Sequence, residues 1–570
     1  MQWNEPSPLL EDANFKSLVG IGIDPITSRL LINRNINTPE EANNFFNPSI
    51  NNLHNPYLMK DMDKAVNIIT EALEKGERIM IFGDYDVDGT TSVALLYTYL
   101  NTLNGDLLTY VPNRYTEGYG ISIQGIDHAK EEGVSLIIAI DCGIRDVEQI
   151  AYAKGLGIDF IICDHHLPSE EIPDALAILN PKQEDCNYPY KELCACAVGF
   201  KLIQAMHSKR GGEIEELLPY LDLVAIATAS DLVPLTGENR ILAATGLKQL
   251  NKPIKRVGIQ ALIESCGINK EITSTDLGFK IGPRINAAGR MESAIHSVNL
   301  LIEESLENAK VIADKIEKYN QERRKHNEEI AKQALEQIIE CNETNNSTTV
   351  VFNETWHRGV LGIVASKLIE NHYRPTIVFG KGEDIYTASA RSVKGFNIYD
   401  ALNECADLLE KFGGHKYAAG LSLKPENYEA FKNKFEEVVK NTIKPECLIP
   451  KIDIEVEVSL SDLVAEENAN FPKIYRILKR MQPFGPGNNS PIFISKAVVE
   501  KYSKKIGEDS KHLRLSISDN STDKTFTGIG FNLADKIEPL NKNHFDVVYS
   551  LDENHWNNNV SLQLMLKDVR

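Results

Sequence analysis

The stretch from Arg78 to Ser92 constrains the fold of this chain more than any other. A β-like apolar run, Ile79 to Phe82, ends in three alternating aspartates, and a helix-forming segment follows. Open α/β sheets place their ligand sites where a strand ends and turns into a helix in this way. At this spacing Asp84, Asp86 and Asp88 repel one another unless a bound cation offsets their charge. The alternative is an Asp-rich turn that caps a helix.

Two later segments repeat this design. The apolar run from Ser135 to Gly143 ends in Asp141, and the run from Asp159 ends in the triplet Asp164 to His166. Continuous β-branched runs separated by helices indicate a parallel sheet covered on both faces. Because the strand ends of a parallel sheet meet at one edge, these metal-competent side chains are expected to converge. Isolated caps and turns then become a poor explanation for them.

Composition indicates several packed domains. The chain has 570 residues, enough for about three or four domains, and 42% of them are hydrophobic. The nine cysteines are scattered and odd in number, which is typical of reduced thiols in a cytosolic protein. No signal-peptide pattern and no apolar run of membrane-spanning length is evident, so we expect a cytoplasmic protein without membrane contact.

The charge of the chain leaves its partner undecided. A formal net charge of −20 argues against broad, nonspecific coating of nucleic acid, which needs basic surface, but allows a local basic groove. A site of clustered carboxylates also makes the metal-free chain look more acidic than the metal-loaded protein.

Two segments in the middle of the chain are ambiguous. The helical region from Tyr220 to Leu235 presents Asp231 after an apolar face, which suits a helix cap and a functional carboxylate about equally. The loop from Gly278 to Met291 combines glycines with Arg284 and Arg290. That pattern suits phosphate but also fits a surface turn with solvated arginines.

A second α/β pattern follows a long charged segment. Residues 300–341 contain no Pro or Gly and have helical apolar spacing, which predicts a rigid connecting helix. Beyond it, the strings SAR and GGH supply Ser389, Arg391 and His415. These side chains can hydrogen-bond phosphate, although a glycine turn with a bystander histidine is the commoner explanation of GGH taken singly.

The C-terminal part of the chain, from Pro491 onward, predicts a small barrel. It alternates short strands with polar turns, as an OB-fold does, and its acidic and basic side chains balance. Aromatic and basic residues on such a barrel suit stacking on single strands, and a merely solubilising barrel is the equal alternative.

These motifs resemble a known family. GDYDVDG, IDCG, CDHH and ASDLVPL resemble the four motifs of the DHH phosphoesterase superfamily, and SAR with GGH resembles its associated second domain. Further strings resemble the RecJ family of single-strand-specific 5′→3′ exonucleases: PNRYTEGYG, GPRINAAGRM, NQERR, WHRGVLGIVASKL and QPFGPGN. The resemblance covers nearly the whole chain. One departure is CACAVGF, Cys194 to Phe200, where many relatives are glycine-rich, and we expect it to alter packing only.

The resemblance implies an α/β fold of two units followed by an OB-like β-barrel. A DHH catalytic domain with a parallel sheet is expected at residues 61–299, with an N-terminal segment, residues 1–60, packed on it. The connecting helix, residues 300–341, leads to a DHH-associated substrate-binding domain at residues 342–445. The nucleic-acid-binding barrel is expected at residues 446–570.

The resemblance also implies site residues. The expected ligands of divalent metal, normally two Mn²⁺ ions with Mg²⁺ as the alternative, are Asp86, Asp88, Asp141, His165 and Asp231. Asp84 and His166 are expected in or beside this shell, and His415 is expected to complete the catalytic set from the second unit. The residues expected to contact the 5′ phosphate and backbone are Arg114, Arg284, Ser389, Arg391, Gly413, Gly414 and His415.

The implied function is a single-stranded-DNA-specific exonuclease that degrades 5′→3′ to mononucleotides by two-metal hydrolysis in recombination and repair. Single-strand-binding protein and a RecQ-type helicase are the expected partners. Two alternatives stay open: a DHH-family phosphodiesterase acting on oligoribonucleotides or cyclic dinucleotides, and a nucleic-acid-binding scaffold with a dead centre. The connector and barrel favour a polymer, and the intact Asp and His set argues against a dead centre.

Overall fold

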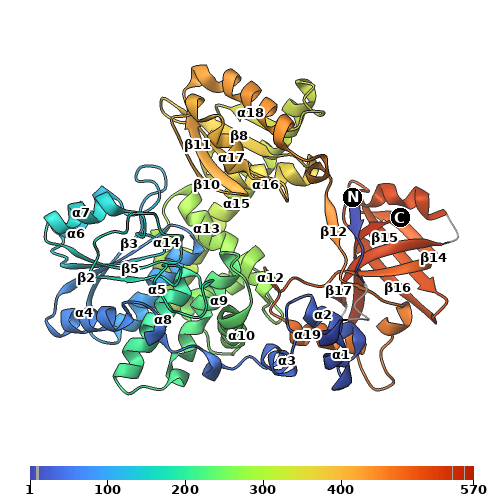
Figure 1. Cartoon of the computed structure of the whole chain (residues 1–570), viewed down its shortest axis with the longest axis horizontal. Helices are drawn as coiled ribbons and strands as arrows, with labels where there is room; N and C mark the ends of the chain where they lie inside the picture. Colours follow the sequence, from blue (N-terminus) through green and yellow to red (C-terminus); the bar gives the residue numbers. More distant parts are fainter. Residues whose placement is uncertain (8–11, 542–543, 557–558) are drawn as a thin grey trace.

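Figure 1 shows three folded parts arranged around a centre that no ribbon crosses in this view. This computed structural model describes residues 1–7, 12–541, 544–556 and 559–570. We call the parts the first α/β unit (residues 62–302), the second α/β unit (residues 349–442) and the barrel (residues 456–569). Every helix in the described ranges is too short or too polar to cross a membrane.

The first α/β unit is built on a five-stranded parallel sheet in the order β3-β2-β4-β5-β6. Its strands are β2 (Arg78–Gly83), β3 (Asp106–Tyr110), β4 (Leu136–Ile140), β5 (Asp159–Cys163) and β6 (Ala177–Leu179). The helices around and after the sheet are α4 (Met62–Glu74), α5 (Val87–Asn101), α6 (Ile123–Glu131), α7 (Val147–Gly155), α8 (Ala195–Lys209), α9 (Leu221–Ser230), α10 (Gly237–Leu250), α11 (Val257–Ser265), α12 (Ser274–Asp276), α13 (Gly282–Met291) and α14 (Ile295–Ile302).

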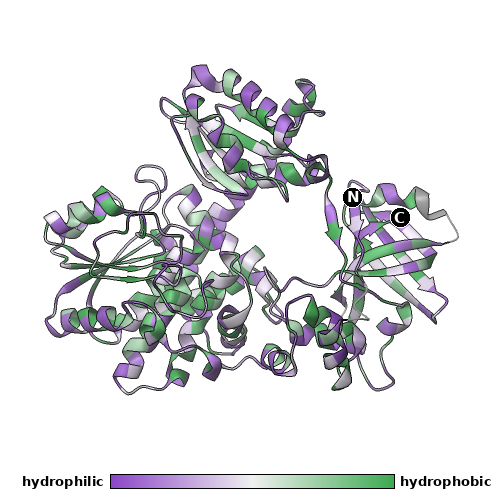
Figure 2. Cartoon of the chain, viewed as in Figure 1, coloured by the Kyte–Doolittle hydropathy of each residue, from purple (hydrophilic) through white to green (hydrophobic). Residues whose placement is uncertain are grey.

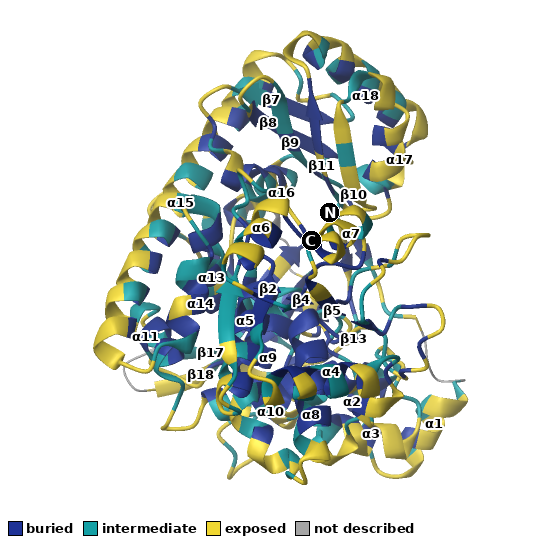
Figure 3. Cartoon of the chain, turned by 90° about the vertical axis from the view of Figure 1, so that its left-hand side faces the viewer, coloured by how far each residue is buried: buried dark blue, intermediate teal, exposed yellow. Residues whose placement is uncertain are grey.

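Both faces of this sheet are buried, as its continuous apolar strands predict. Ile79 and Ile81 of β2 pack in one core with α4, α5 and α8, whereas Met80 and Phe82 pack in another with α6 and α7. Figure 2 shows the strands as largely hydrophobic, and Figure 3 shows the interior of the unit as buried. All strands run in one direction, so their carboxyl ends share one edge.

The start of the connecting helix differs from the expectation. Instead of one helix from residue 300, α14 ends at Ile302 and α15 (Leu306–Glu340) begins after Ser305. The Ser305 hydroxyl caps α15 by accepting a hydrogen bond of 3.4 Å from the amide of Asn308. The residues between the two helices continue the charged pattern of a helix, and a single serine does not interrupt it. The sequence pattern therefore did not reveal the break between α14 and α15. Figure 3 shows α15 running along the outside of the molecule from the first unit to the second.

The second α/β unit has a five-stranded mixed sheet in the order β10-β11-β9-β8-β7, in which only β7 and β8 are parallel. Its strands are β7 (Thr349–Asn353), β8 (Thr376–Lys381), β9 (Tyr386–Arg391), β10 (Lys411–His415) and β11 (Ala418–Leu423). Its helices are α16 (Leu361–Asn371), α17 (Ile398–Asn403) and α18 (Tyr428–Thr442). The GGH string therefore lies on an edge strand, β10.

The barrel confirms the OB-like prediction. Pairing of β14 with β17 closes a ring of five strands, β14 to β18, and the short β13 adds to its side. The strands are β13 (Val456–Glu457), β14 (Phe493–Ile506), β15 (His512–Asp519), β16 (Thr522–Gly530), β17 (Phe545–Trp556) and β18 (Asn559–Val569), with helix α19 (Lys473–Met481) beside them. A small parallel pair, β1 (Gln2–Asn4) and β12 (Lys451–Asp453), joins the N-terminus to the linker before the barrel.

The N-terminal segment packs differently from the expectation. Its helices α1 (Ala13–Gly20), α2 (Pro25–Ile32) and α3 (Pro39–Phe46) share a core with the barrel, in which Leu18, Leu30 and Phe45 meet Leu478 and Phe493. Apart from Phe45, which contacts Arg240 of α10, the segment joins the apolar core of the first α/β unit from Ile50 onward. Short amphipathic helices carry no signal that says which of two apolar surfaces they cover, so this difference is a product of tertiary packing.

Candidate metal centre and anion pocket

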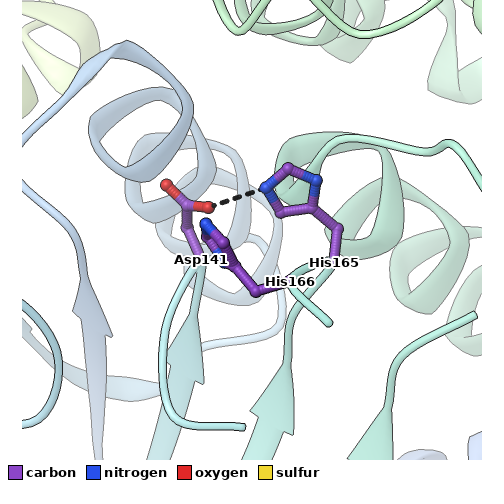
Figure 4. A group of neighbouring side chains, drawn as sticks. All are labelled: Asp141, His165 and His166. Atoms are coloured by element: carbon purple, nitrogen blue, oxygen red, sulfur yellow. Dashed lines mark ion pairs between the residues drawn. The ribbon is translucent and has the colours of Figure 1, made fainter. Parts of the chain in front are cut away.

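The carboxyl edge of the parallel sheet brings the predicted acidic and imidazole side chains together. Asp84 and Asp86 follow β2, Asp141 follows β4 and His165 follows β5, while Asp231 ends α9. Three overlapping groups place their ligand atoms within 4.8 Å of one another: Asp84, Asp86 and Asp141; Asp88, His165 and Asp231; and Asp141, His165 and His166, which Figure 4 shows. We call these seven residues the metal centre.

His165 is the hub of the metal centre. Its Nε2 lies 3.4 Å from Asp141 Oδ1, 3.7 Å from Asp231 Oδ2 and 3.8 Å from Asp88 Oδ2. These separations are longer than hydrogen bonds. They suit atoms that share one ion, because a first-row ion lies about 2.0–2.2 Å from each nitrogen or oxygen ligand.

Backbone amides at the start of α8 hold Asp88. Its Oδ2 accepts a hydrogen bond of 2.7 Å from the amide of Ala195, and its Oδ1 accepts one of 2.9 Å from the amide of Cys196. These two hydrogen bonds fix the orientation of the Asp88 carboxylate. The N-terminus of α8 also favours its ionised form, because a helix N-terminus favours negative charge. The segment with the unusual CACAVGF sequence therefore supplies main-chain donors, while the side chains of Cys194 and Cys196 are buried.

Burial and mutual repulsion shift the pKa values of the side chains in the metal centre. Burial, and then the charge of Asp86, raises the pKa of Asp88 to about 7. Burial, and then the charges of Asp88 and Asp86, raises the pKa of Asp231 to about 9. Burial lowers the pKa of His165 to about 3, so its imidazole is neutral, which is the form that binds metal.

The residues present fit divalent cations. The buried atoms Asp84 Oδ1 and His165 Nε2 have no hydrogen-bond partner within the described residues, and buried polar atoms of this kind are rare without a ligand or water. Carboxylates mixed with imidazole suit a first-row transition ion, whereas Mg²⁺ prefers oxygen ligands and bound water.

Asp164 organises the histidines and was not among the predicted site residues. Its Oδ1 accepts hydrogen bonds from the His165 amide at 2.7 Å, the His166 amide at 3.1 Å and His166 Nδ1 at 2.7 Å. Its Oδ2 accepts one of 3.1 Å from the amide of Ile144. Burial opposes the effect, yet the hydrogen bond from His166 keeps the pKa of Asp164 below its ordinary value. The signal was available, because Asp164 is the first polar residue after β5.

A cluster of guanidinium groups, which we call the anion pocket, lies where the first α/β unit contacts the start of α16. Its guanidinium groups belong to Arg114, Arg290, Arg323 and Arg391. Burial, and then the charges of Arg114 and Arg323, lowers the pKa of Arg290 to about 9. The Nε atoms of Arg114 and Arg323 have no hydrogen-bond partner in the described part of the chain. Clustered, partly unsatisfied guanidinium groups of this kind suit a phosphate.

The N-terminus of α16 completes the anion pocket. A methyl group on Gly362, the second residue of this helix, would lie 2.7 Å from Arg391 Nη2 and 3.4 Å from Ser389 Oγ. Glycine therefore leaves the space that these two side chains need. The first turn of a helix attracts anions, and Gly362 places this turn of α16 beside Arg391 and Ser389. Ser389, Gly362 and the four arginines define the anion pocket.

Arg284 and Arg290 have different surroundings because the segment expected as a loop is helical. It forms a π-helical turn (Leu277–Ile281) followed by α13. Arg284 forms an ion pair of 2.6 Å with Glu317 on α15, whereas Arg290 lies in the anion pocket and donates to the Gly359 carbonyl at 2.9 Å. Residues six apart on a helix lie on different faces. Arg284 was the expected phosphate contact, and a helical interpretation of the segment would have separated it from Arg290.

His415 approaches the metal centre from the second unit. It ends the edge strand β10 and is exposed. Partial burial of its ring, and then the charges of Arg145 and His166 in the first unit, lowers its pKa. Gly414 has φ +150° and a methyl group there would lie 2.4 Å from the Ala418 carbonyl oxygen, so this position requires glycine. Gly413 has open space at its Cβ position.

Comparisons with known proteins agree with this geometry. Family models match at residues 78–228 (DHH family, N-terminal domain), 345–441 (DHHA1 domain) and 461–568 (RecJ OB domain). The chain is 38% identical to the single-stranded-DNA-specific exonuclease RecJ of Bacillus subtilis, over 100% of this chain and 71% of that protein. It is 34% identical to the RecJ of Salmonella typhimurium, over 96% of each. The crystal structure of RecJ in complex with Mn²⁺ from Thermus thermophilus matches with a TM-score of 0.83 and 26% identity, over 100% of this chain and 79% of that one.

Proposed function

Because this chain belongs to the RecJ family of single-stranded-DNA-specific exonucleases, we propose that it hydrolyses single-stranded DNA from the 5′ end to mononucleotides. The observation that carries this proposal is the anion pocket beside the metal centre. The Arg114 guanidinium lies 4.1 Å from the centre of the Tyr85 ring, and Tyr85 stands between Asp84 and Asp86 in the chain, so the two sites adjoin. A 5′ phosphate bound in the pocket places the first phosphodiester at the metal centre, and each cleavage then removes one nucleotide.

The metal centre is proposed to hold two Mn²⁺ ions, with Mg²⁺ as the alternative. Bound ions of this kind supply a hydroxide nucleophile at neutral pH and offset the charge that develops on phosphorus. The proposed ligands are Asp86, Asp88, Asp141, His165 and Asp231, with Asp84 and His166 beside them. The Thermus thermophilus protein has been solved with Mn²⁺ and with Mg²⁺, which supports a divalent ion at this centre.

The other proposed roles belong to polar groups of both units. Arg114, Arg284, Ser389 and Arg391 hold the terminal phosphate, and Arg290 adds to them. His415 hydrogen-bonds the reacting phosphate from the second unit, where a fixed donor is most effective as charge develops. The two glycines before His415 let the DNA backbone approach β10 closely. The barrel extends the surface that binds single-stranded DNA, by electrostatic attraction and by stacking on the bases.

We propose that the chain acts in recombination and repair in the cytoplasm, with single-strand-binding protein and a RecQ-type helicase as partners. These partners follow from family membership alone. No observation favours a cyclic dinucleotide or a short oligoribonucleotide as substrate, and the buried, complete set of Asp and His ligands argues against a dead scaffold.

The proposed activity is tested with single strands labelled at either end and digested in the presence of Mn²⁺. We expect labelled mononucleotide to appear first from the 5′-labelled strand, with a matched blunt duplex and a cyclic dinucleotide resistant under the same conditions. Release first from the 3′ end, or equal digestion of the duplex, contradicts the proposal.

The substitution Gly362→Ala is expected to reduce the preference for 5′-phosphorylated ends. The new methyl group displaces the Arg391 guanidinium from the anion pocket. A hydrogen bond to a charged group is worth about 1.5–3 kcal/mol, so the ratio of rates on phosphorylated and unphosphorylated strands should fall roughly ten- to hundredfold. Gly155→Ala is the control, because its Cβ position meets no atom within 4 Å. An unchanged ratio in Gly362→Ala argues against this placement of the 5′ phosphate.

The effect of Mn²⁺ on stability is expected to grow with pH. In the metal-free fold, the pKa of Asp88 is raised to about 7 and that of Asp231 to about 9. Between about pH 4 and these values, the folded chain binds protons that the unfolded chain has lost, so its free energy of unfolding falls as pH rises. Bound cations offset these charges. The increase in melting temperature on adding Mn²⁺ should therefore be larger at about pH 8 than at about pH 5, as thermal unfolding with and without chelator will measure. A larger increase at the lower pH contradicts the assignment.

A further inference from the structure

A buried arginine on α10 joins the first α/β unit to the helix beside the barrel. Arg240 is 4% exposed. Its Nη1 donates to the Met481 carbonyl at 2.9 Å, its Nη2 to the Gln482 carbonyl at 3.0 Å and its Nε to the Phe45 carbonyl at 3.0 Å. The guanidinium also lies 3.8 Å from the centre of the Phe45 ring. One side chain thus holds the end of α19 and the end of α3, both of which pack with the barrel.

The carbonyls that Arg240 binds need a donor. The last turn of any helix leaves carbonyl groups without intrahelical partners, and these carry partial negative charge. Arg240 acts as the C-terminal cap of α19, although it comes from another part of the molecule. In the described part of the chain, no carboxylate lies within ion-pair distance of Arg240, and its hydrogen-bond acceptors are backbone carbonyls, with longer contacts to those of Arg480 and Pro483 besides the three above. Separating the barrel from the first unit would leave the Arg240 guanidinium and the carbonyls at the end of α19 without these hydrogen-bond partners.

The rest of this junction consists of the loop after α19, residues 482–488, which carries the QPFGPGN string. The Leu235 amide donates to the Pro486 carbonyl at 2.7 Å, and the Ser274 hydroxyl donates to the Phe484 carbonyl at 2.8 Å. We call Arg240 and these loop contacts the barrel junction. Figure 1 shows α12 and α19 approaching each other on the side of the molecule away from the second α/β unit.

We propose that Arg240 is a positioning residue that keeps the barrel docked on the first α/β unit, so that one strand stays bound through many successive cleavages. The inference rests on the proposed function, because it needs a strand that contacts both the barrel and the metal centre. When two binding surfaces are held at a fixed separation, a strand released by one is still bound by the other. The strand therefore stays at high effective concentration near the free surface and rebinds before it dissociates. With the junction open, the barrel is connected to the first unit through the N-terminal helices and the chain after α3, and to the second unit through residues 443–455.

The test compares wild type with Arg240→Met in a trap assay, in which excess unlabelled strand captures every enzyme that dissociates. We expect Arg240→Met to release roughly tenfold fewer nucleotides per binding event, while the rate of the first cleavage on a short 5′-phosphorylated strand stays within about twofold of wild type. Arg476→Met is the matched control, because Arg476 lies on α19, the helix that Arg240 caps, but pairs with the exposed Glu466.

A disulfide provides a reversible second variant. A Cβ atom on Gly485 would lie 3.8 Å from the Leu235 Cβ, which is about the mean separation in disulfides. We add this cysteine pair, Leu235→Cys and Gly485→Cys, to Arg240→Met and change the exposed Cys341 to serine. The oxidised protein should again release many nucleotides per binding event, which we call a long run, and the reduced protein should release few. Unchanged runs in folded Arg240→Met, or oxidised protein with runs as short as reduced protein, overturn the inference.

Small-angle X-ray scattering gives a readout that needs no activity. Arg240→Met should have a larger radius of gyration than wild type, and oxidation of the cysteine pair should reverse the change. If wild type releases no mononucleotide from 5′-labelled strands, the proposed function fails, and scattering still decides whether the junction holds the barrel. If wild type digests and both runs and scattering are unaffected by Arg240→Met, the inference alone fails.

Discussion

Replacing Asp141 with asparagine will abolish Mn²⁺-dependent digestion of single strands while leaving their binding intact. Asp141 belongs to two of the three groups of potential ligands, one with Asp84 and Asp86 and one with His165 and His166. Losing one negative oxygen at this position therefore weakens the whole metal centre. We expect a loss of roughly 10³-fold or more in rate, the scale seen when one member of a catalytic unit is removed.

Asparagine is the suitable replacement because the backbone of Asp141 has φ +65°, a conformation that asparagine tolerates. Initial rates on a 5′-labelled strand measure the loss, and fluorescence anisotropy without metal measures strand binding. Asp159→Asn is the control: Asp159 begins β5 and is exposed, so it lies at the opposite edge of the same sheet. Digestion by Asp141→Asn at the wild-type rate would refute the metal centre.

Much of the metal centre could be predicted because parallel strands impose a rule on distant residues. Asp84, Asp141 and His165 each follow a buried apolar strand, and one sheet edge must then gather them. Asp231 is different, since its sequence context suited a cap equally well. Its position depends on how the largely buried helix α9 packs against α5, which a lone aspartate after an apolar run does not reveal.

The anion pocket and the domain contacts were harder to predict. Gly362 contributes the space beside Arg391, and a missing side chain leaves no chemical signature in a sequence. Arg240 resembles any arginine on a helix, because the carbonyls it binds lie about 240 residues away in the chain. Backbone acceptors are present at every position, so tertiary hydrogen bonds to carbonyls carry no sequence pattern.

Asp164 is expected to control how tightly the metal centre holds its ions. Asp164 belongs to none of the three groups of potential ligands. It nevertheless fixes both imidazole rings, because it accepts hydrogen bonds from the amides of His165 and His166 and from His166 Nδ1. In Asp164→Asn, one oxygen becomes an amide nitrogen that faces backbone donors instead of accepting from them. The histidines then lose their fixed orientation although the volume of the side chain is unchanged.

We expect Asp164→Asn to need about 10- to 100-fold more Mn²⁺ for half-maximal activity, the usual effect of losing a group that orients a ligand. At saturating Mn²⁺ its rate should return to within about tenfold of wild type, because every proposed ligand is still present. Asp174→Asn is the control, since Asp174 is exposed and pairs with Lys154. Rates measured across a Mn²⁺ titration separate affinity from turnover. If the titration midpoint is unchanged, Asp164 does not orient ligands, and if high Mn²⁺ fails to restore activity, Asp164 acts in the reaction itself.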